Sequence, residues 1–431
     1  MGARATTVKC FVIGDGSSPK SRIDAPLGQI LFFVAFGVWL AAQILWRTWY
    51  VAPISKLVPL NDIRTFCWAA LLVHEVVYGR RDLRSLVGFV VAAALAAIAY
   101  SVNFTVIFDS ICFIFVARDI PFKRIARVAF VEMAVLICFV IVTALLGITT
   151  DALYEVGSER GTRHALGFGH PNTAPAFSVF AFFLWAYLRG KRYSWGDAAG
   201  MLAIEGFLFY LTNSRSAFIL AILLVVLMMA CHYAPDSWSK SRLLKVLGIG
   251  SVLIVATFTL VLCVVYDPEI NWMSQLNSLL SGRIQLSHTA LEDFGVPLLG
   301  QNITFDGGSN YNRYTGKWVT GSSTHIVDDL YVRILVNCGA LYFLASLALS
   351  TLTTHRLYKQ GQFHVLAIIW VIALYGIVES CSGYLVYDVL LFLLALPLAP
   401  PPPKEMGDSG EGAPASAGST GTAESPLPKE G

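Results

Sequence analysis

The stretch LGQILFFVAFGVWLAAQILW, from Leu27 to Trp46, decides the fold class of this chain. It contains no charged residue, and it has the length of about 20 apolar residues that a helix needs to cross a bilayer. Similar runs recur along the 431 residues, of which 56% are hydrophobic and 14% are charged. A typical soluble protein carries about 25% charged residues. The sequence therefore predicts an all-α protein, a polytopic helical bundle in a membrane.

Twelve apolar segments are candidates for membrane spans, and the connections between them alternate in charge. If the N-terminus lies inside the cell, the inner connections hold 21 of the 31 basic residues, as the positive-inside rule requires. We therefore expect about 12 transmembrane helices in the cell (plasma or inner) membrane, with the N- and C-termini cytoplasmic. The predicted spans are 27–46, 58–78, 86–101, 103–117, 126–148, 170–188, 197–211, 215–232, 243–265, 330–352, 363–380 and 384–400.

Composition divides the chain into three parts. Residues 1–26 are polar and are expected to form a cytoplasmic N-terminal segment. Residues 27–400 form the predicted membrane domain, in which residues 266–330 make one long outer loop. Residues 401–431 are rich in Pro, Gly, Ser, Ala and Glu and hold too few apolar side chains to fold. We expect a disordered cytoplasmic tail there.

Ten basic residues remain in the outer connections, and eight of them are arginines. Orientation signals use Lys and Arg alike, whereas phosphate binding favours Arg because a guanidinium grips phosphate oxygens in a bidentate way. The bias predicts a phosphorylated ligand at the outer face. The alternative is contact with lipid headgroups, which we favour for Arg47 because Trp46, Trp49 and Tyr50 beside it are typical of an interfacial aromatic belt.

The stretch RHALGFGHPNTAP (residues 163–175) places polar residues between two apolar segments. The proline after His170 disfavours helix there, and Asn172 is a good N-cap for the next span. A helix N-terminus beside an arginine is an anion site, so we predict a catalytic role for Arg163 and substrate binding for His170 and Asn172. Arg160 is a further binding candidate, for which a lipid-facing role is equally plausible. Three glycines are expected to let the backbone approach the ligand: Gly161, Gly167 and Gly169.

A second helix N-terminus beside an arginine occurs in LTNSRSAF (residues 211–218), where one span ends and the next begins at once. Ser214 is a plausible cap, and Arg215 lies in the first helical turn, where a positive charge opposes the helix macrodipole. An anion over the helix end would compensate that cost. We therefore predict a catalytic role for Arg215 and ligand contact for Ser214, with a snorkelling arginine as the alternative.

The long outer loop holds further candidates, beginning with Arg283 in the amphipathic stretch SGRIQL (residues 281–286), which could lie back over the membrane surface. Tyr311 and Trp318 suit stacking against sugar rings, although an interfacial aromatic patch is the commoner explanation. Long loops of this kind are usually functional or disordered.

The stretch SSTHIVDDLYVRIL (residues 322–335) enters the tenth predicted span. His325 has a pKa suited to a catalytic base, and Asp328 is a candidate for substrate binding, although capping is the simpler role for an acidic pair at a helix start. Glu379, near the outer end of the eleventh span, could join the site. Carboxylates within predicted spans are costly and are expected to be functional or to brace the bundle: Asp109, Glu132 and Glu205.

The motifs RHALGFGHPN, TNSRSAF, SGRIQL and DDLYVRILVNCGAL occur in an order and spacing that resemble the Wzy polysaccharide polymerase and WaaL O-antigen ligase superfamily. The resemblance covers about residues 27–400, and GFGHPN is closer to the polymerases of Gram-positive capsule and exopolysaccharide clusters than to the ligases. The chain departs from the family at Leu330, where Asn is common, and at Ser216, where Gly is common.

The resemblance implies a membrane glycosyltransferase of the C-type architecture that polymerises undecaprenyl-diphosphate-linked oligosaccharide units. It implies an inverting reaction without a metal or cofactor. Arg163, Arg215 and Arg283 match the family's outer arginines, which would stabilise the departing diphosphate, and His325 matches approximately a histidine before the helix after the large loop. The implied partners are the lipid-linked glycan as donor and acceptor, membrane lipids, a chain-length regulator and a flippase, with no nucleic acid.

Two other functions remain open at this point. An O-antigen ligase uses the same donor and arginines but transfers the glycan to a different acceptor. A flippase of lipid-linked glycans would move the substrate without reaction. Transporters usually place binding groups at the membrane midplane and often show internal symmetry, whereas the charged motifs here lie in outer connections and no repeat is visible.

Overall fold

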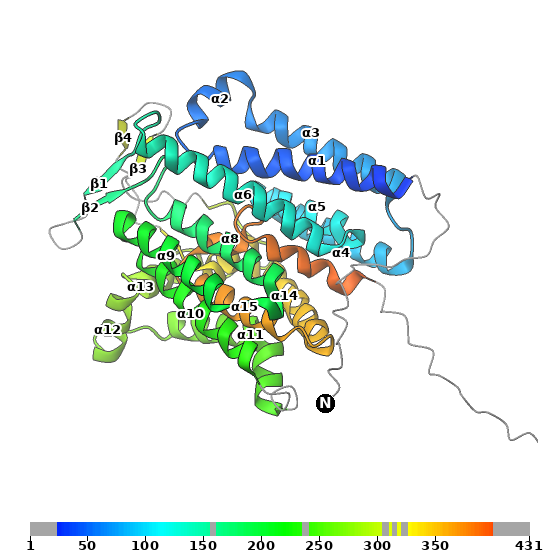
Figure 1. Ribbon diagram of the computed structural model, residues 1–431. Helices are drawn as coiled ribbons and strands as arrows, with labels where there is room; N and C mark the ends of the chain where they lie inside the picture. The colour runs from blue at the N-terminus through cyan, green and yellow to red at the C-terminus, as the bar shows by residue number, and fades with distance from the viewer. Residues whose placement is uncertain are drawn as a thin grey trace, which may run out of the picture. The chain divides into compact units, whose positions relative to one another are not determined.

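The computed structural model describes residues 24–155, 161–234, 241–303, 310–312, 317–319 and 326–399, and these residues are mainly helical (Figure 1). The α-helices are α1 (Asp24–Leu45), α2 (Val51–Leu57), α3 (Leu60–Tyr78), α4 (Leu83–Ser101), α5 (Thr105–Val116), α6 (Phe122–Leu145), α8 (Thr173–Arg189), α9 (Trp195–Thr212), α10 (Arg215–Tyr233), α11 (Arg242–Val264), α12 (Asn271–Leu279), α13 (Arg283–Phe294), α14 (Leu330–Lys359) and α15 (Phe363–Gly376). Short 3₁₀ helices are η1 (Ala117–Asp119), η2 (Gly190–Arg192), η4 (Ser380–Gly383) and η5 (Val389–Leu398). Antiparallel hairpins join β1 (Leu153–Glu155) to β2 (Thr162–His164) and β3 (Asn310–Asn312) to β4 (Lys317–Val319).

Six of the described helices are long and apolar enough to cross a membrane, namely α1, α4, α6, α10, α11 and α14. The other predicted spans also fall on helices, but α5, α15 and η5 contain only 12, 14 and 10 residues. A straight crossing needs roughly 20 residues. The all-α fold with membrane-length helices is confirmed, and the number of twelve crossings stays a prediction.

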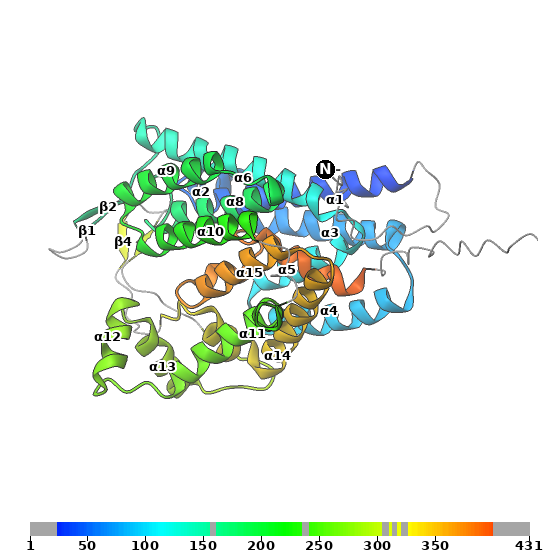
Figure 2. The ribbon, with the colours of Figure 1, turned by 60° about the horizontal axis from the view of Figure 1, so that its bottom comes forward.

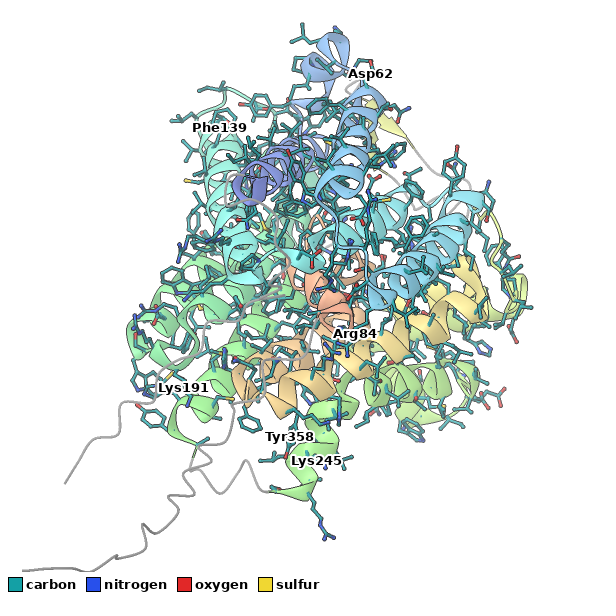
Figure 3. All side chains as sticks on the ribbon, turned by 90° about the vertical axis from the view of Figure 1, so that its right-hand side faces the viewer. Asp62, Arg84, Phe139, Lys191, Lys245 and Tyr358 are labelled. Carbon is teal, nitrogen blue, oxygen red and sulfur yellow. The ribbon has the colours of Figure 1, made fainter. Side chains whose placement is uncertain are left out.

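Large apolar side chains cover the outer faces of these helices. Val90 of α4 is 59% exposed, Phe139 of α6 is 47% exposed and Val226 of α10 is 56% exposed. Figure 3 shows Phe139 at the periphery of the bundle. Monomeric soluble proteins rarely expose large contiguous apolar patches, whereas lipid tails accept them without cost. The exposed side chains therefore agree with a membrane setting.

An aromatic cluster on α1 forms part of the interior. Phe32, Phe36 and Trp39 are fully buried and recur every three or four residues, so they share one helix face. The ring of Phe113 in α5 lies 5.0 Å from Trp39, and the ring of Phe392 in η5 lies 5.3 Å from Phe36. Ring pairs at such distances stabilise a core beyond their buried area. The cluster packs this face of α1 against α5 and η5.

A buried ion pair joins α3 to α5. Asp109 is fully buried, and Arg64 donates hydrogen bonds to its two carboxylate oxygens at 2.9 and 3.0 Å. The indole N–H groups of Trp39 and Trp68 donate to the same carboxylate at 3.1 and 2.9 Å. A buried charge is tolerated when it is paired and hydrogen-bonded. Asp109 thus braces the bundle, and Arg64 is engaged inside it rather than facing an outer ligand.

The predicted inner connections meet at one end of the helices, which we call the basic end. Arg80 pairs with Asp119 at 3.2 Å and donates a hydrogen bond to the carbonyl oxygen of Leu398 at 2.8 Å. Arg356, near the end of α14, donates to the carbonyl oxygen of Ala399 at 3.0 Å. Basic side chains from connections far apart in the sequence therefore gather at the same end.

The predicted outer connections meet at the opposite end, which we call the site end. The backbone N–H of Trp49 donates to the carbonyl oxygen of Gly167, and that of Gly169 donates to the carbonyl oxygen of Arg47, each at 3.0 Å. Figure 1 shows α2, the hairpin of β1 and β2, and α12 and α13 at this end.

Helix α14 is broken at Gly339, whose φ of 86° and ψ of 170° are not helical. The segment after α13 crosses the break and supplies the missing hydrogen bonds. The backbone N–H of Ala340 donates to the carbonyl oxygen of Pro297 at 2.8 Å, and that of Gln301 donates to the carbonyl oxygen of Asn337 at 2.9 Å. This crossing fixes α13 against α14, which Figure 2 shows beside α11.

Candidate functional site

The loop before α8 is folded by its own contacts. Asp151 accepts a hydrogen bond from the backbone N–H of Leu166 at 2.7 Å and pairs with His164 at 2.6 Å. Gly167 has a φ of +83°, and a Cβ there would lie 2.8 Å from a methyl carbon of Val140 in α6. Gly167 therefore serves close packing on α6, which corrects the expectation that it lets the backbone approach a ligand.

Arg163 is almost fully buried on β2, and two hydrogen bonds orient its guanidinium. Its Nε donates to the carbonyl oxygen of Thr212 at 2.6 Å, and a terminal nitrogen donates to Oδ1 of Asn172 at 2.5 Å. Asn172 holds the predicted N-cap position of α8, but its side chain makes no capping hydrogen bond. Its amide instead connects Arg163 to Glu379, where Nδ2 donates to Oε1 at 3.1 Å.

Arg283 begins α13 and faces two carboxylates. A terminal guanidinium nitrogen donates to Oε1 of Glu379 at 3.0 Å, and Nε lies 3.4 Å from Oδ2 of Asp328. Glu379 lies in the turn after α15, and Asp328 lies just before α14. Four segments that are far apart in the sequence thus meet in one cluster, which we call the arginine–carboxylate site: Arg163, His170, Asn172, Arg283, Asp328 and Glu379.

His170 lies within electrostatic range of both arginines of this site. Burial, followed by the charges of Arg163 and Arg283, lowers the pKa of His170 to about 4, so the imidazole is neutral at pH 7. Its Nδ1 accepts a hydrogen bond from the backbone N–H of Asn172 at 3.2 Å, which assigns the proton of the neutral ring to Nε2. The ring of Tyr154 packs edge-on at 5.4 Å. His170 is therefore suited to donate a hydrogen bond to an anion.

The two aspartates before α14 have different contacts. Asp329 is 2% exposed, and its side chain accepts a hydrogen bond from the backbone N–H of Val332 at 2.9 Å. This is the capping role that the sequence favoured for the acidic pair. Asp328 instead pairs with Arg283.

The corner between α9 and α10 lies beside the site. Thr212, whose carbonyl oxygen anchors Arg163, ends α9. Ser214 is buried at the N-cap position of α10 but makes no side-chain capping bond. Arg215 is exposed as the first residue of α10. Within the described part of the chain, no hydrogen bond or ion pair joins Arg215 to the arginine–carboxylate site.

Four other predicted site residues are not placed against this site by the described part of the chain. Arg160 and His325 lie outside the described residues, as do the tail 401–431 and most of the N-terminal segment 1–26. Tyr311 and Trp318 lie opposite each other in the register of β3 and β4. Their pairing places both aromatic residues on one hairpin.

An apolar cavity of about 470 Å³ lies between α4, α5, α14, α15 and η5. Typical lining residues are Leu95, Ile111, Ile334 and Leu391. Ser382 and Gly383, which follow Glu379 closely in the chain, lie at its polar margin, as does Leu330, which follows Asp328. The lining on α14 extends from Leu330 to Thr354, on both sides of the break at Gly339. The cavity therefore has lining residues close in sequence to the site and others toward the far end of α14.

Two parts of this arrangement left no signal in the sequence. The carbonyl oxygen of Thr212 acts through the backbone, which carries no residue-specific pattern. The cavity is built from apolar residues of five elements, each of which looks like ordinary core or lipid-facing surface when taken alone.

Comparisons with models of known protein families, with curated proteins and with solved structures find no match to this chain.

Proposed function

We propose that the protein polymerises undecaprenyl-diphosphate-linked oligosaccharide units into capsular or exopolysaccharide at the outer face of the cell membrane. The observation that carries the proposal is the meeting of Arg163 and Arg283 at one end of a bundle of membrane-length helices, beside an apolar cavity. A lipid-linked diphosphate has the matching parts, because its anionic head needs cations and its polyprenyl chain needs apolar surface. We propose twelve spans and cytoplasmic termini, which place the site end outside.

The charge of the leaving group supports this assignment. When the glycan leaves its carrier, negative charge develops on the diphosphate, and preorganised donors aimed at that charge lower the barrier. Arg163 and Arg283 supply two cations, and the N–H of His170 supplies a neutral donor. Arg215 at the neighbouring helix start is proposed to complete the anion site. Tyr311 and Trp318 are proposed to stack on the sugars, which would be the role of an aromatic hairpin.

The test is a reconstitution with one substrate. Purified protein in liposomes, given a single undecaprenyl-diphosphate-linked repeat unit, is expected to produce a ladder of longer lipid-linked glycans. An O-antigen ligase would give no ladder without a second acceptor, and a flippase would leave the chain length unchanged. Folded protein that leaves the substrate unaltered would refute the polymerase proposal.

Arginine variants test the anion site within the same assay. Arg163→Lys and Arg283→Lys are each expected to lower turnover about 10- to 100-fold, because a lysine cannot reproduce charge-assisted hydrogen bonds worth roughly 1.5–3 kcal/mol. Arg192 is exposed at the basic end, and Arg192→Lys is the matched control, which should keep wild-type activity. Full activity in both site variants, at normal protein levels, would show that the guanidinium geometry is irrelevant.

A further inference from the structure

The described residues hold Glu379 at one of its two carboxylate oxygens. Its Oε1 accepts hydrogen bonds from Arg283 at 3.0 Å and from Asn172 at 3.1 Å. Oε2 accepts no hydrogen bond from the residues that the structure describes, and the side chain is 18% exposed. One oxygen is thus occupied in positioning the group, while the other is available to a reacting hydroxyl.

The other proton acceptors of the site are less suited to take a proton from a substrate. Nδ1 of His170 already accepts a backbone hydrogen bond, and its Nε2 carries the ring proton. Asp328 is 35% exposed and lies 3.4 Å from Arg283, and the described residues give it no second anchor comparable to Asn172. Among the described residues, Glu379 therefore combines a fixed position with an available oxygen.

Glu379 also occupies the place on Arg283 that a phosphate group would take. A carboxylate and a phosphate compete for the same N–H groups of a guanidinium, and Glu379 takes up one of those of Arg283. The two carboxylates at Arg283 compensate the charges of Arg163 and Arg283, so an anionic ligand has to compete with them. Loss of the Arg283 contact would leave Glu379 attached to Asn172 alone.

We propose that Glu379 is the general base of the site and that the donor diphosphate activates it by displacing its carboxylate from Arg283. This inference rests on the proposed function, since it assigns the proton acceptor for that reaction. Donor binding and base activation then become one event, and a hydroxyl meets an active base only when a donor is present.

The transfer step balances without a further reactant. The acceptor hydroxyl gives its proton to Oε2 of Glu379 while its oxygen forms a bond to the anomeric carbon of the donor glycan. The bond from that carbon to the diphosphate oxygen breaks, and its electron pair leaves with the undecaprenyl diphosphate. Arg163 and Arg283 neutralise the new charge, and Glu379 later returns its proton to water.

The acidity of Glu379 agrees with this role. Burial, followed by the charge of the neighbouring Asp328 carboxylate, raises the pKa of Glu379 above its usual range, against the opposing charge of Arg283. A general base works best when its pKa lies near the working pH.

Glu379→Gln tests the proposal because glutamine keeps the size and one acceptor oxygen but cannot take up the proton. Turnover in the ladder assay is expected to fall about 10²- to 10⁴-fold. The affinity for undecaprenyl diphosphate, measured by titration in detergent, should stay equal or become tighter because a competing anion has been removed. Glu292→Gln, which alters a carboxylate of α13 that is 66% exposed, is the control and should behave as wild type.

A second variant separates a base from a structural ion pair. Glu379→Ala should be inactive, and added formate should restore part of its turnover by serving as an external base. An active Glu379→Gln variant would overturn the assignment, as would a joint loss of turnover and diphosphate affinity or a failure of formate to rescue. A wild-type protein that forms no ladder would instead refute the proposed function, and with it this assignment.

Discussion

The position of Asn172 could be predicted from the sequence, but its hydrogen-bond partner could not. The sequence placed it correctly at the start of α8, because Pro and Asn at a helix entrance are local signals. Its bond to Glu379 joins residues 207 positions apart, and no local pattern contains that information. The residues of the arginine–carboxylate site were therefore foreseeable as candidates, while their pairing was not.

The burial of His170 leads to a prediction about stability and pH. The unfolded imidazole has a pKa near 6.5, and the folded one has a pKa of about 4. The unfolded chain therefore binds more protons between these values, and this contribution to stability is lost as the pH falls from about 6.5 to about 4. The thermal unfolding midpoint of wild-type protein in detergent should drop over this range, and it should drop less in His170→Gln.

His232 is exposed at the basic end and provides the control for that measurement. His232→Gln should show the same pH dependence as the wild type. An unchanged acid sensitivity in His170→Gln would mean that another group titrates.

At the scale of elements, the long apolar segments predicted the helices well and their interruptions poorly. Each predicted span falls on a helix because about 20 apolar residues leave the backbone no other way to satisfy its hydrogen bonds in lipid. The break of α14 was not foreseen, since Gly339 looks like any other small residue in a span. Its cause is the close backbone of Gly300, which lies 39 positions away in the chain.

This break predicts a strict requirement for glycine. A Cβ at position 339 would lie 2.4 Å from the backbone nitrogen of Gly300, and the φ and ψ values are essentially limited to glycine at a cost of about 1–3 kcal/mol for other residues. Gly339→Ala should lower the unfolding midpoint and displace α13 with Arg283, which would reduce turnover.

Gly200, which is exposed on α9, provides the matched control. A Cβ at Gly200 in α9 meets no atom within 4 Å, so Gly200→Ala should be neutral or stabilise the protein by roughly 0.5–1 kcal/mol. Equal thermal stability of Gly339→Ala and the wild type would show that the segment after α13 can move to make room for the added Cβ.

For the whole molecule, the alternation of basic loops predicted which connections lie at the same end of the bundle. Arg80 and Arg356 share the basic end, whereas Arg163, Arg283 and Glu379 share the opposite end. The pattern of charges indicates at which end of the bundle a loop lies. It does not indicate which loops touch, because contacts between loops at one end are set by helix packing. The sequence thus separated the two ends correctly and could not assemble the site.

Single cysteines in a cysteine-free background test which end faces out. A thiol at Ser274 on α12, at the site end, should react with an impermeant maleimide added to intact cells. A thiol at Lys191 in η2, near the basic end, should react only after the cells are permeabilised. The reverse labelling pattern would place the arginine–carboxylate site inside and exclude an outer polymerase.

The ion pair between Arg64 and Asp109 also bears on the order in which the chain is synthesised. The ribosome makes Arg64 45 residues before Asp109, so α3 emerges before the carboxylate that pairs with its arginine in the folded protein. A charge within an apolar segment makes insertion costly. We therefore expect α3 to reach its final position only after α5 has been made and can supply Asp109.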